Sequence, residues 1–321
     1  MFSKIAGTGS QLPKRVVTND ELAKSVDTSD EWIVSRTGIK QRYLVSDGET
    51  NLDLAEGAAR NAMDMAGVTA AEVDLIVVGT TTPNQVFPNM GCLLQQRLGV
   101  SDAPAFSLEA ACTSFIYALS VADKFIKTGG AQCALVVGSE TLSSIVDWTD
   151  RSTCVLFGDG AGAVVLKPSD RPGIRSTHIS ANGQYKDLLF LESGISNGFD
   201  NLKSGRDFVQ MKGNEVFKVA VRRLGGIAKT ALEHNNLAKE DLTWLVPHQA
   251  NIRIIQAAAK MLNMPMERVI QTVQDHGNTS AASVPLALDT GVRDGRIKRG
   301  DTLLLEAFGG GFTWGAALLD F

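Results

Sequence analysis

The sequence predicts an α/β fold made of two similar halves, and three observations indicate it. Short apolar segments alternate with segments of helical periodicity, as expected when helices cover both faces of a sheet. One spacing recurs: Asp74 and Ala134, in two predicted strands, are 60 residues apart, as are Thr243 and Leu303. Each half also closes on a glycine-rich turn and a final strand, "GDGAGAVVLK" and "GGGFTWGAALLDF". We therefore expect a duplicated fold, although α/β chains also look self-similar by chance.

The individual elements follow from local patterns. Short runs of aliphatic and β-branched residues predict strands over 74–80, 133–140, 161–167, 242–248, 301–308 and 315–321. Apolar residues at helical spacing predict helices over 52–66, 113–127, 214–235, 251–262 and 281–294. The halves then span 1–172 and 173–321, with "KPSDRPGI" as the linker.

Composition narrows the class of protein. The chain has 321 residues and a net charge of −4, which argues against a nucleic-acid partner. It shows no apolar run long enough to span a membrane and no apolar N-terminal segment typical of a signal peptide, so we expect no membrane partner. Its four cysteines form no metal-binding pattern, and Cys133 and Cys154 lie in strand-like runs. A reducing, cytoplasmic location and no metal are expected.

Cys112 is the first candidate for chemistry. It follows the short apolar stretch "PAFSLEAA" and precedes a helix that is apolar almost all round. Free N–H groups and the positive dipole end of that helix would lower the pKa of the thiol and favour the nucleophilic thiolate. The alternative is a small packed side chain.

Further candidates come from the second half. His248 ends an apolar strand, where α/β proteins place ligand sites, and Asn251 is suited to cap the helix that follows. "DHGNTSAAS" puts His276 and Asn278 before another helix, at a position matching the Cys112 junction; an Asn there is either a cap or an oxyanion donor. Each histidine also has a purely structural interpretation.

Glycine and charge patterns add two hypotheses. "AFGGGFTWG" is either a plain turn or a loop whose N–H groups approach a ligand. "GDGAGA" precedes a strand, so it is not a dinucleotide-binding motif. Lys218, Arg222 and Lys229 share one helix face and Arg253 and Lys260 another, which indicates solvated faces or a docking patch for an acidic partner.

Tryptophan and arginine recur together in two places. Trp32 and Arg36 are four residues apart in "DEWIVSRTGI", and "DWTDR" adds Trp148 and Arg151. Such pairs either pack structurally or hold a flat base and its phosphates.

Six stretches in order resemble the β-ketoacyl-acyl-carrier-protein synthase III family of the thiolase superfamily. They are "DEWIVSRTGI", the Cys112 junction, "DWTDRSTCVLFGDGAGA", "VPHQANIRI", "HGNTSAAS" and "FGGGFTWG". The resemblance covers essentially the whole chain and implies a thiolase-like duplicated five-layer αβαβα sandwich, usually a homodimer. One departure is "CTSF" at 112–115, where bacterial members often have "CAGF"; it leaves the nucleophile intact and puts pocket shape in doubt.

The resemblance also implies roles. Cys112 matches the acyl-accepting nucleophile, and His248 and Asn278 match the pair that supports malonyl decarboxylation. Gly310 matches the glycine that completes the oxyanion hole with the N–H of Cys112. Matches to residues that bind coenzyme A or the acyl group are Trp32, Arg36, Arg151, Phe157, Asn251, Phe308 and, reaching across from the dimer mate, Phe87. Matches to the docking patch for acyl carrier protein are Lys218, Arg253 and Lys260.

The implied reaction joins an acyl-CoA primer, acetyl or another short acyl group, to malonyl-acyl-carrier protein through an acylated Cys112. It needs no cofactor, since coenzyme A enters as a thioester substrate. A neutral His248 is required, and the nearby helix start is expected to lower its pKa. Two alternatives stay open: a related condensing enzyme of a polyketide, quinolone or head-to-head pathway, and a non-catalytic acyl-binding subunit.

Overall fold

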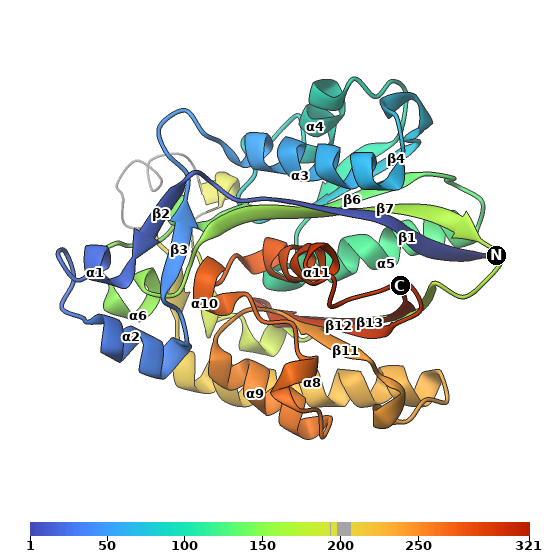
Figure 1. The fold of residues 1–321 in the computed structure, drawn as a ribbon. Helices are drawn as coiled ribbons and strands as arrows, with labels where there is room; N and C mark the ends of the chain where they lie inside the picture. The colour runs from blue at the N-terminus through green and yellow to red at the C-terminus, as the bar shows by residue number, and fades with distance from the viewer. Residues whose placement is uncertain (193, 198–206) are drawn as a thin grey trace.

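The computed structural model describes residues 1–192, 194–197 and 207–321. Its elements stack in five layers, helices alternating with sheets (Figure 1). The outer helices are α3 (Asn51–Ala66) and α4 (Met90–Leu98) on one side and α8 (Gly213–His234) and α9 (Ile252–Met261) on the other. The central layer holds α5 (Ser114–Lys127) and α11 (Ser283–Arg293) between the two sheets. The five-layer sandwich is therefore the predicted one.

The two sheets repeat one strand order. The first sheet runs β1-β7-β6-β4-β5 and the second runs β8-β13-β12-β11. The strands of the first are β1 (Phe2–Gln11), β4 (Leu75–Gly79), β5 (Ala105–Leu108), β6 (Ala134–Thr141) and β7 (Asp159–Ser169). Those of the second are β8 (Ile174–Ala181), β11 (Trp244–Pro247), β12 (Thr302–Gly309) and β13 (Thr313–Asp320).

Strand register explains the repeated spacing. Leu75 of β4 pairs in parallel with Ala134 of β6, and Trp244 of β11 pairs in parallel with Leu303 of β12. In both sheets the next strand is antiparallel, β7 beside β6 and β13 beside β12. The duplicated fold is confirmed by this shared topology, whereas the boundary at 172 remains a prediction.

Side-chain caps fix the starts of α3 and α9. Thr50 caps α3 by accepting the N–H of Asp53, whose carboxylate accepts the Thr50 N–H in return. Asn251 caps α9 by accepting the N–H of Ile254 at 3.0 Å, as predicted. These caps fix where α3 and α9 begin, whereas the turns that lead into α5 and α11, at the Cys112 and Asn278 junctions, have no side-chain cap.

Smaller elements surround one end of the sandwich. They are β2 (Arg15–Thr18), α1 (Asn19–Leu22), α2 (Asp30–Thr37), β3 (Gln41–Leu44), α6 (Arg151–Cys154), β9 (Leu189–Phe190), β10 (Gln210–Met211) and α10 (Val273–His276). Cys154 therefore ends a helix, and its predicted strand-like setting is wrong. The glycine-rich segment of the first half is also no turn, because Gly160 and Gly162 lie inside β7. A Cβ at Gly162 would meet the Leu286 nitrogen at 2.7 Å, so glycine lets α11 pack closely on β7.

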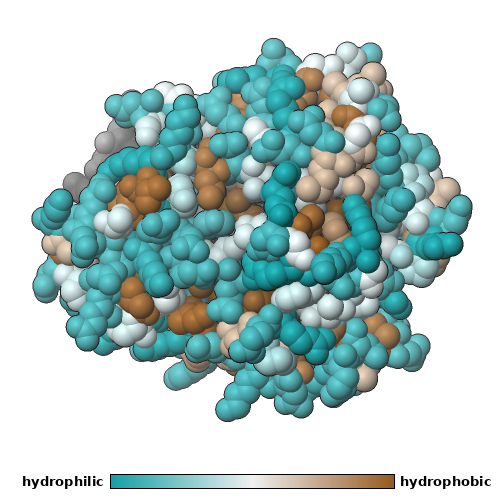
Figure 2. Space-filling view, viewed as in Figure 1, coloured by the Kyte–Doolittle hydropathy of each residue, from teal (hydrophilic) through white to brown (hydrophobic). Residues whose placement is uncertain are grey.

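The surface in Figure 2 is mostly hydrophilic, with apolar residues in scattered patches. Within the described residues, no helix combines the length and apolarity that crossing a membrane requires, and no cluster of side chains suited to hold a metal ion occurs. Of the large apolar side chains in the described part of the chain, Phe87 is the most exposed, at 85%, and its neighbour Val86 is 60% exposed.

Candidate active site

One cavity of about 580 Å³ lies where the two central helices begin. The predicted residues that line it are Cys112, Phe157, His248, Asn251, Asn278, Phe308 and Gly310. Much of the remaining wall is apolar, including Leu189, Val209, Leu224 and Ile254. The fold thus gathers residues from both halves of the chain around one space.

Cys112 lies in a short helical turn, Ala111–Thr113, that leads directly into α5. The preceding residue, Ala111, has a left-handed backbone with φ of 47°. Ser280 begins the matching turn before α11 with φ of 48°, and it follows Ala111 by the same 169 residues that separate Leu75 from Trp244. The two junctions are therefore equivalent in backbone shape, but the counterpart of Cys112 is Ala281.

The ionisation expected for Cys112 is wrong for this structure. Burial raises the pKa of the thiol to about 12, and the nearby carboxylates Glu140 and Glu109 add to that rise. A hydrogen bond with the Ser280 side chain acts in the opposite direction. The resting nucleophile is therefore a neutral thiol, so its proton must leave as the sulfur attacks.

His248 is buried at the end of β11, where its backbone N–H donates to the Glu306 carbonyl at 2.7 Å. Burial lowers the pKa of the imidazole to about 3, so the ring is neutral as predicted. The physical cause is desolvation and not the start of α9. Its Nδ1 atom is buried and has no hydrogen-bond partner among the described residues, while the residue itself lines the cavity.

Asn278 is held by backbone contacts on both sides. Its N–H donates to the Leu156 carbonyl at 2.8 Å, and its carbonyl accepts the Gly158 N–H at 2.9 Å. Its side-chain oxygen accepts the Ser280 N–H at 2.9 Å. Because the oxygen is occupied in this way, the amide NH₂ group is left to donate.

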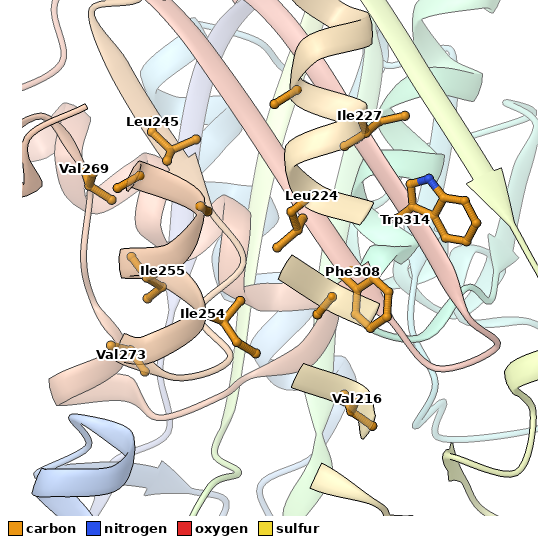
Figure 3. Packing of buried hydrophobic residues seen from close by; sticks show 14 of the residues in the cluster. Val216, Leu224, Ile227, Leu245, Ile254, Ile255, Val269, Val273, Phe308 and Trp314 are labelled. Atoms are coloured by element: carbon orange, nitrogen blue, oxygen red, sulfur yellow. The ribbon is translucent and has the colours of Figure 1, made fainter. Parts of the chain in front are cut away.

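The glycine loop 309–312 joins β12 to β13 and packs against the nucleophile. A Cβ at Gly309 would lie 2.6 Å from the Cys112 nitrogen, which explains why glycine is needed there. Phe308, just before the loop, packs with side chains of α8 and α9, among them Leu224 and Ile254 (Figure 3). The loop is thus fixed by the core on one side and by the turn at Cys112 on the other.

The predicted coenzyme A residues outside the cavity form one stack. The Arg36 and Arg151 guanidinium carbons lie 4.7 and 4.8 Å from the centroid of the Trp32 ring. Arg151 also donates to the Asp27 carbonyl at 2.7 Å. Trp148 does not join this stack; its indole N–H donates to the Ser143 carbonyl at 3.1 Å.

Other predicted residues lie elsewhere. Lys218 on α8 and Arg253 and Lys260 on α9 are exposed, and Phe87 is exposed outside the cavity of its own chain. His276 is half-buried and packs against Tyr43 with ring centroids 6.0 Å apart, and it does not line the cavity.

Sequence reasoning missed three buried groups next to the site. Ser280 donates to a Glu140 carboxylate oxygen at 3.2 Å, and both carboxylate oxygens of Glu306 lack a partner among the described residues. Burial raises the pKa of Glu140 to about 7 and that of Glu306 to about 8. Both glutamates lie in apolar segments that the sequence predicts to be strands, and no sequence signal indicates that they lie next to the site.

The duplicated sandwich, with a buried cysteine at the head of a central helix, defines a thiolase-like protein. Residues 106–183 match the family model described as 3-oxoacyl-(acyl-carrier-protein) synthase III, and residues 232–321 match the model of its C-terminal part. The chain belongs to this family, also called the β-ketoacyl-acyl-carrier-protein synthase III family.

Relatives and solved structures agree. A β-ketoacyl-acyl-carrier-protein synthase III of Thioalkalivibrio sulfidiphilus is 60% identical over 320 residues, covering 100% of this chain and 99% of the relative. The crystal structure of the Aquifex aeolicus synthase III has a TM-score of 0.94 at 48% identity, covering 99% of this chain and 100% of that one. The priming β-ketosynthase of the R1128 polyketide pathway has a TM-score of 0.94 at 40% identity, covering 99% and 96%.

Proposed function

We propose that the chain catalyses a decarboxylating Claisen condensation between a short acyl-CoA and malonyl-acyl-carrier protein, which starts fatty-acid synthesis. The observation that carries this proposal is the convergence of Cys112, His248 and Asn278 on one cavity, in a member of the synthase III family. The reaction as proposed uses no metal or redox cofactor. Four free cysteines support a reducing, cytoplasmic setting.

In the first half-reaction, the Cys112 sulfur attacks the acyl thioester and coenzyme A leaves. The backbone N–H groups of Cys112 and Gly310 serve as the oxyanion donors, because the loop 309–312 packs against the Cys112 nitrogen. The apolar wall around them excludes water, so the acylated cysteine is protected from hydrolysis.

In the second half-reaction, neutral His248 and the Asn278 NH₂ group donate hydrogen bonds to the thioester oxygen of the malonyl group. Loss of CO₂ places negative charge on that oxygen, and the donors stabilise it. The resulting carbanion attacks the acyl group on Cys112 and gives a 3-oxoacyl-carrier protein. A donor role for His248 requires the neutral ring that burial produces.

Supporting residues complete the proposal. Trp32, Arg36 and Arg151 bind the nucleotide of coenzyme A, while Asn251, Phe157 and Phe308 line the route of the pantetheine and acyl groups. Lys218, Arg253 and Lys260 dock the acidic carrier protein. Phe87 is assigned to the cavity of the second subunit in a homodimer, which accounts for its exposure in the single chain.

The test is intact-mass analysis after incubation with a panel of acyl-CoA thioesters. We expect one acyl group per chain, with the highest yield for short acyl-CoA substrates. The adduct should be lost in Cys112→Ala and kept in the control Cys92→Ala. Condensation near the wild-type rate by Cys112→Ala would overturn the mechanism. The likeness to the R1128 priming enzyme supports a second candidate, a starter enzyme of a polyketide pathway. A preference for a carrier other than that of fatty-acid synthesis would favour it.

A further inference from the structure

A second cavity, of about 890 Å³, lies against a face of α8 that does not line the active site. Ala220 and Leu224 of this helix line the active-site cavity, whereas Arg222, Arg223 and Ile227 line the second one. Side chains of α5, β8 and β13 complete its wall. The reaction proposed above uses none of the residues that line this cavity, so that reaction does not account for it.

The wall of the second cavity carries cations that no lining carboxylate balances. Lys124, Arg222 and Arg223 line it together with His178, and none of the described lining residues is an aspartate or a glutamate. Neither arginine forms an ion pair within the described part of the chain. The Nε atom of Arg223 is buried without a hydrogen-bond partner there, while the guanidinium carbon lies 4.5 Å from the centroid of the Trp314 ring. A bound anion would satisfy this buried donor.

Lys124 is only partly neutralised. Its Nζ atom lies 2.9 Å from Asp123 Oδ2, but Lys127 shares the same oxygen at 3.0 Å. The positive surroundings also act on His178: desolvation lowers the pKa of its ring most, and the charges of His234 and Lys124 lower it further. The cavity therefore keeps an excess of positive charge.

The duplicated fold contains an equivalent arrangement that is electrically complete. Asp289 of α11 accepts the Thr8 hydroxyl of β1 at 2.7 Å and the Arg293 Nε–H at 2.9 Å. The Asp289 carboxylate is buried and forms an ion pair with Arg293. Here the cation at the edge of the central layer is matched by a carboxylate from the same helix.

The second cavity repeats this arrangement without its carboxylate. The positions 169 residues away from Asp289, Arg293 and Thr8, the separation of the two central turns, are those of Ser120, Lys124 and Thr177. Ser120 Oγ and Thr177 Oγ1 are 2.8 Å apart, and Lys124 Nζ donates to Thr177 Oγ1 at 3.1 Å. The cation and the strand hydroxyl are thus kept, whereas a serine stands where the other helix has its aspartate.

We propose that this cavity binds a phosphate-bearing small molecule, whose oxygens take the role that the Asp289 carboxylate has in the equivalent arrangement. Three lining cations favour an anion of two or more charges over a single carboxylate. The guanidinium groups of Arg222 and Arg223 suit phosphate oxygens because their N–H donors form a planar fork. The hydroxyl groups of Ser120 and Thr177, which line the same wall, add further hydrogen-bonding groups.

The experiment is a calorimetric titration of the full chain with inorganic pyrophosphate at low ionic strength. We expect one saturable site per chain that weakens as sodium chloride is added. Ser120→Asp places a carboxylate at the position equivalent to Asp289, so it should weaken pyrophosphate binding at least about tenfold through repulsion. Ser120→Asn is the matched control, because it is similar in size and uncharged, and it should keep the site.

A second pair of variants tests the cations. Arg222→Gln should weaken pyrophosphate binding about tenfold, because it removes a charge-assisted hydrogen bond. Lys229→Gln removes the same charge from the same helix, but Lys229 pairs with Glu233 at 3.6 Å and does not line the cavity. It should bind pyrophosphate like the wild type. If Ser120→Asp does not fold, Arg222→Gln decides, since that side chain is exposed.

The proposal is overturned if the wild type shows no saturable site or if Ser120→Asp keeps the wild-type affinity. It is also overturned if Arg222→Gln weakens binding no more than Lys229→Gln does. Arg36→Ala should keep the site, and loss of binding in Arg36→Ala alone would place the anion at the Trp32 stack instead. None of these outcomes depends on acyl transfer, so the proposed function is tested separately.

Discussion

The Arg151 guanidinium carbon lies 4.8 Å from the centroid of the Trp32 ring. An adenine between the two would need about 7 Å, because each stacked contact takes about 3.5 Å. The two residues are therefore in direct contact here, and a base that enters between them must displace Arg151 from the ring. Binding of adenine between Trp32 and Arg151 therefore requires Arg151 to move.

Trp32→Ala and Arg151→Ala should each raise the KM for acyl-CoA about tenfold while changing kcat less, because stacking on a base contributes about 1–3 kcal/mol. Trp32→Phe should retain part of the affinity. The measurement is acylation kinetics with acyl-CoA and, as control, with an N-acetylcysteamine thioester that lacks the nucleotide. Equal losses with both substrates would show that the stack only supports the fold.

His248→Ala and Asn278→Ala should lower malonyl decarboxylation at least about 100-fold, because each removes a donor to the developing enolate. Acylation of Cys112 should be affected much less, and the two rates are measured separately by CO₂ release and by intact mass. Since burial lowers the pKa of His248 to about 3, the ring stays neutral from pH 5 to 9. A decarboxylation rate that changes with a midpoint near pH 6.5 would contradict a neutral His248 over this range.

Phe87→Asp should shift the protein toward monomer and reduce acylation in parallel, if the exposed ring completes the cavity of a partner subunit. Sedimentation velocity over a range of concentrations measures the first effect. Lys24→Asp, at an exposed residue outside the cavity lining, serves as a control for added negative charge and should leave both the sedimenting mass and acylation unchanged. A wild-type protein that sediments as a monomer at all concentrations would remove the basis for this assignment.

Arg253→Glu and Lys218→Glu should raise the KM for malonyl-acyl-carrier protein about fivefold, with little change for acyl-CoA, because surface charge mainly steers association. The difference should shrink as salt is added. Arg171→Glu in the turn between β7 and β8 is a matched charge reversal, at the other end of β8 from the glycine loop. If it weakens carrier binding equally, net charge and not a docking patch is responsible.

The sequence predicts the long periodic elements well because their burial is set by local pattern, as in α3 and β6. No strand is predicted over β1, where glycines interrupt the apolar pattern. A Cβ at Gly9 would lie 2.3 Å from the Ala58 carbonyl oxygen, so that glycine serves the packing of α3 on the strand. Such a requirement comes from the tertiary fold and leaves no periodic signal.

The same limit applies to the site. Cys112, His248 and Asn278 stand at predictable junctions, so sequence reasoning found them. The direction of the pKa shift at Cys112 was not predicted, because a helix start lowers the pKa of a thiol, whereas burial, Glu140 on β6 and Glu109 just after β5 raise it. Glu140 and Ser280 are 140 residues apart, and only the packing of the turn before α11 against β6 brings them together.

Glu306→Gln should flatten the dependence of stability on pH. Burial raises the pKa of this carboxyl from 4.5 to about 8, so the fold favours the protonated form. Its contribution to the free energy of unfolding is complete below pH 4.5 and is lost as the pH rises toward 8, because the carboxyl of the unfolded chain releases its proton at lower pH than that of the folded chain. Between pH 5 and 8 the wild type should lose about 3 kcal/mol from this group alone, and urea unfolding at both pH values measures it. The pKa of Glu140 is also raised, but Glu140 is present in both proteins. The difference between their unfolding free energies therefore isolates the effect of Glu306. The exposed Glu240→Gln should follow the wild-type curve, and a Glu306→Gln curve parallel to both would show that the carboxyl is ionised in the folded protein at neutral pH.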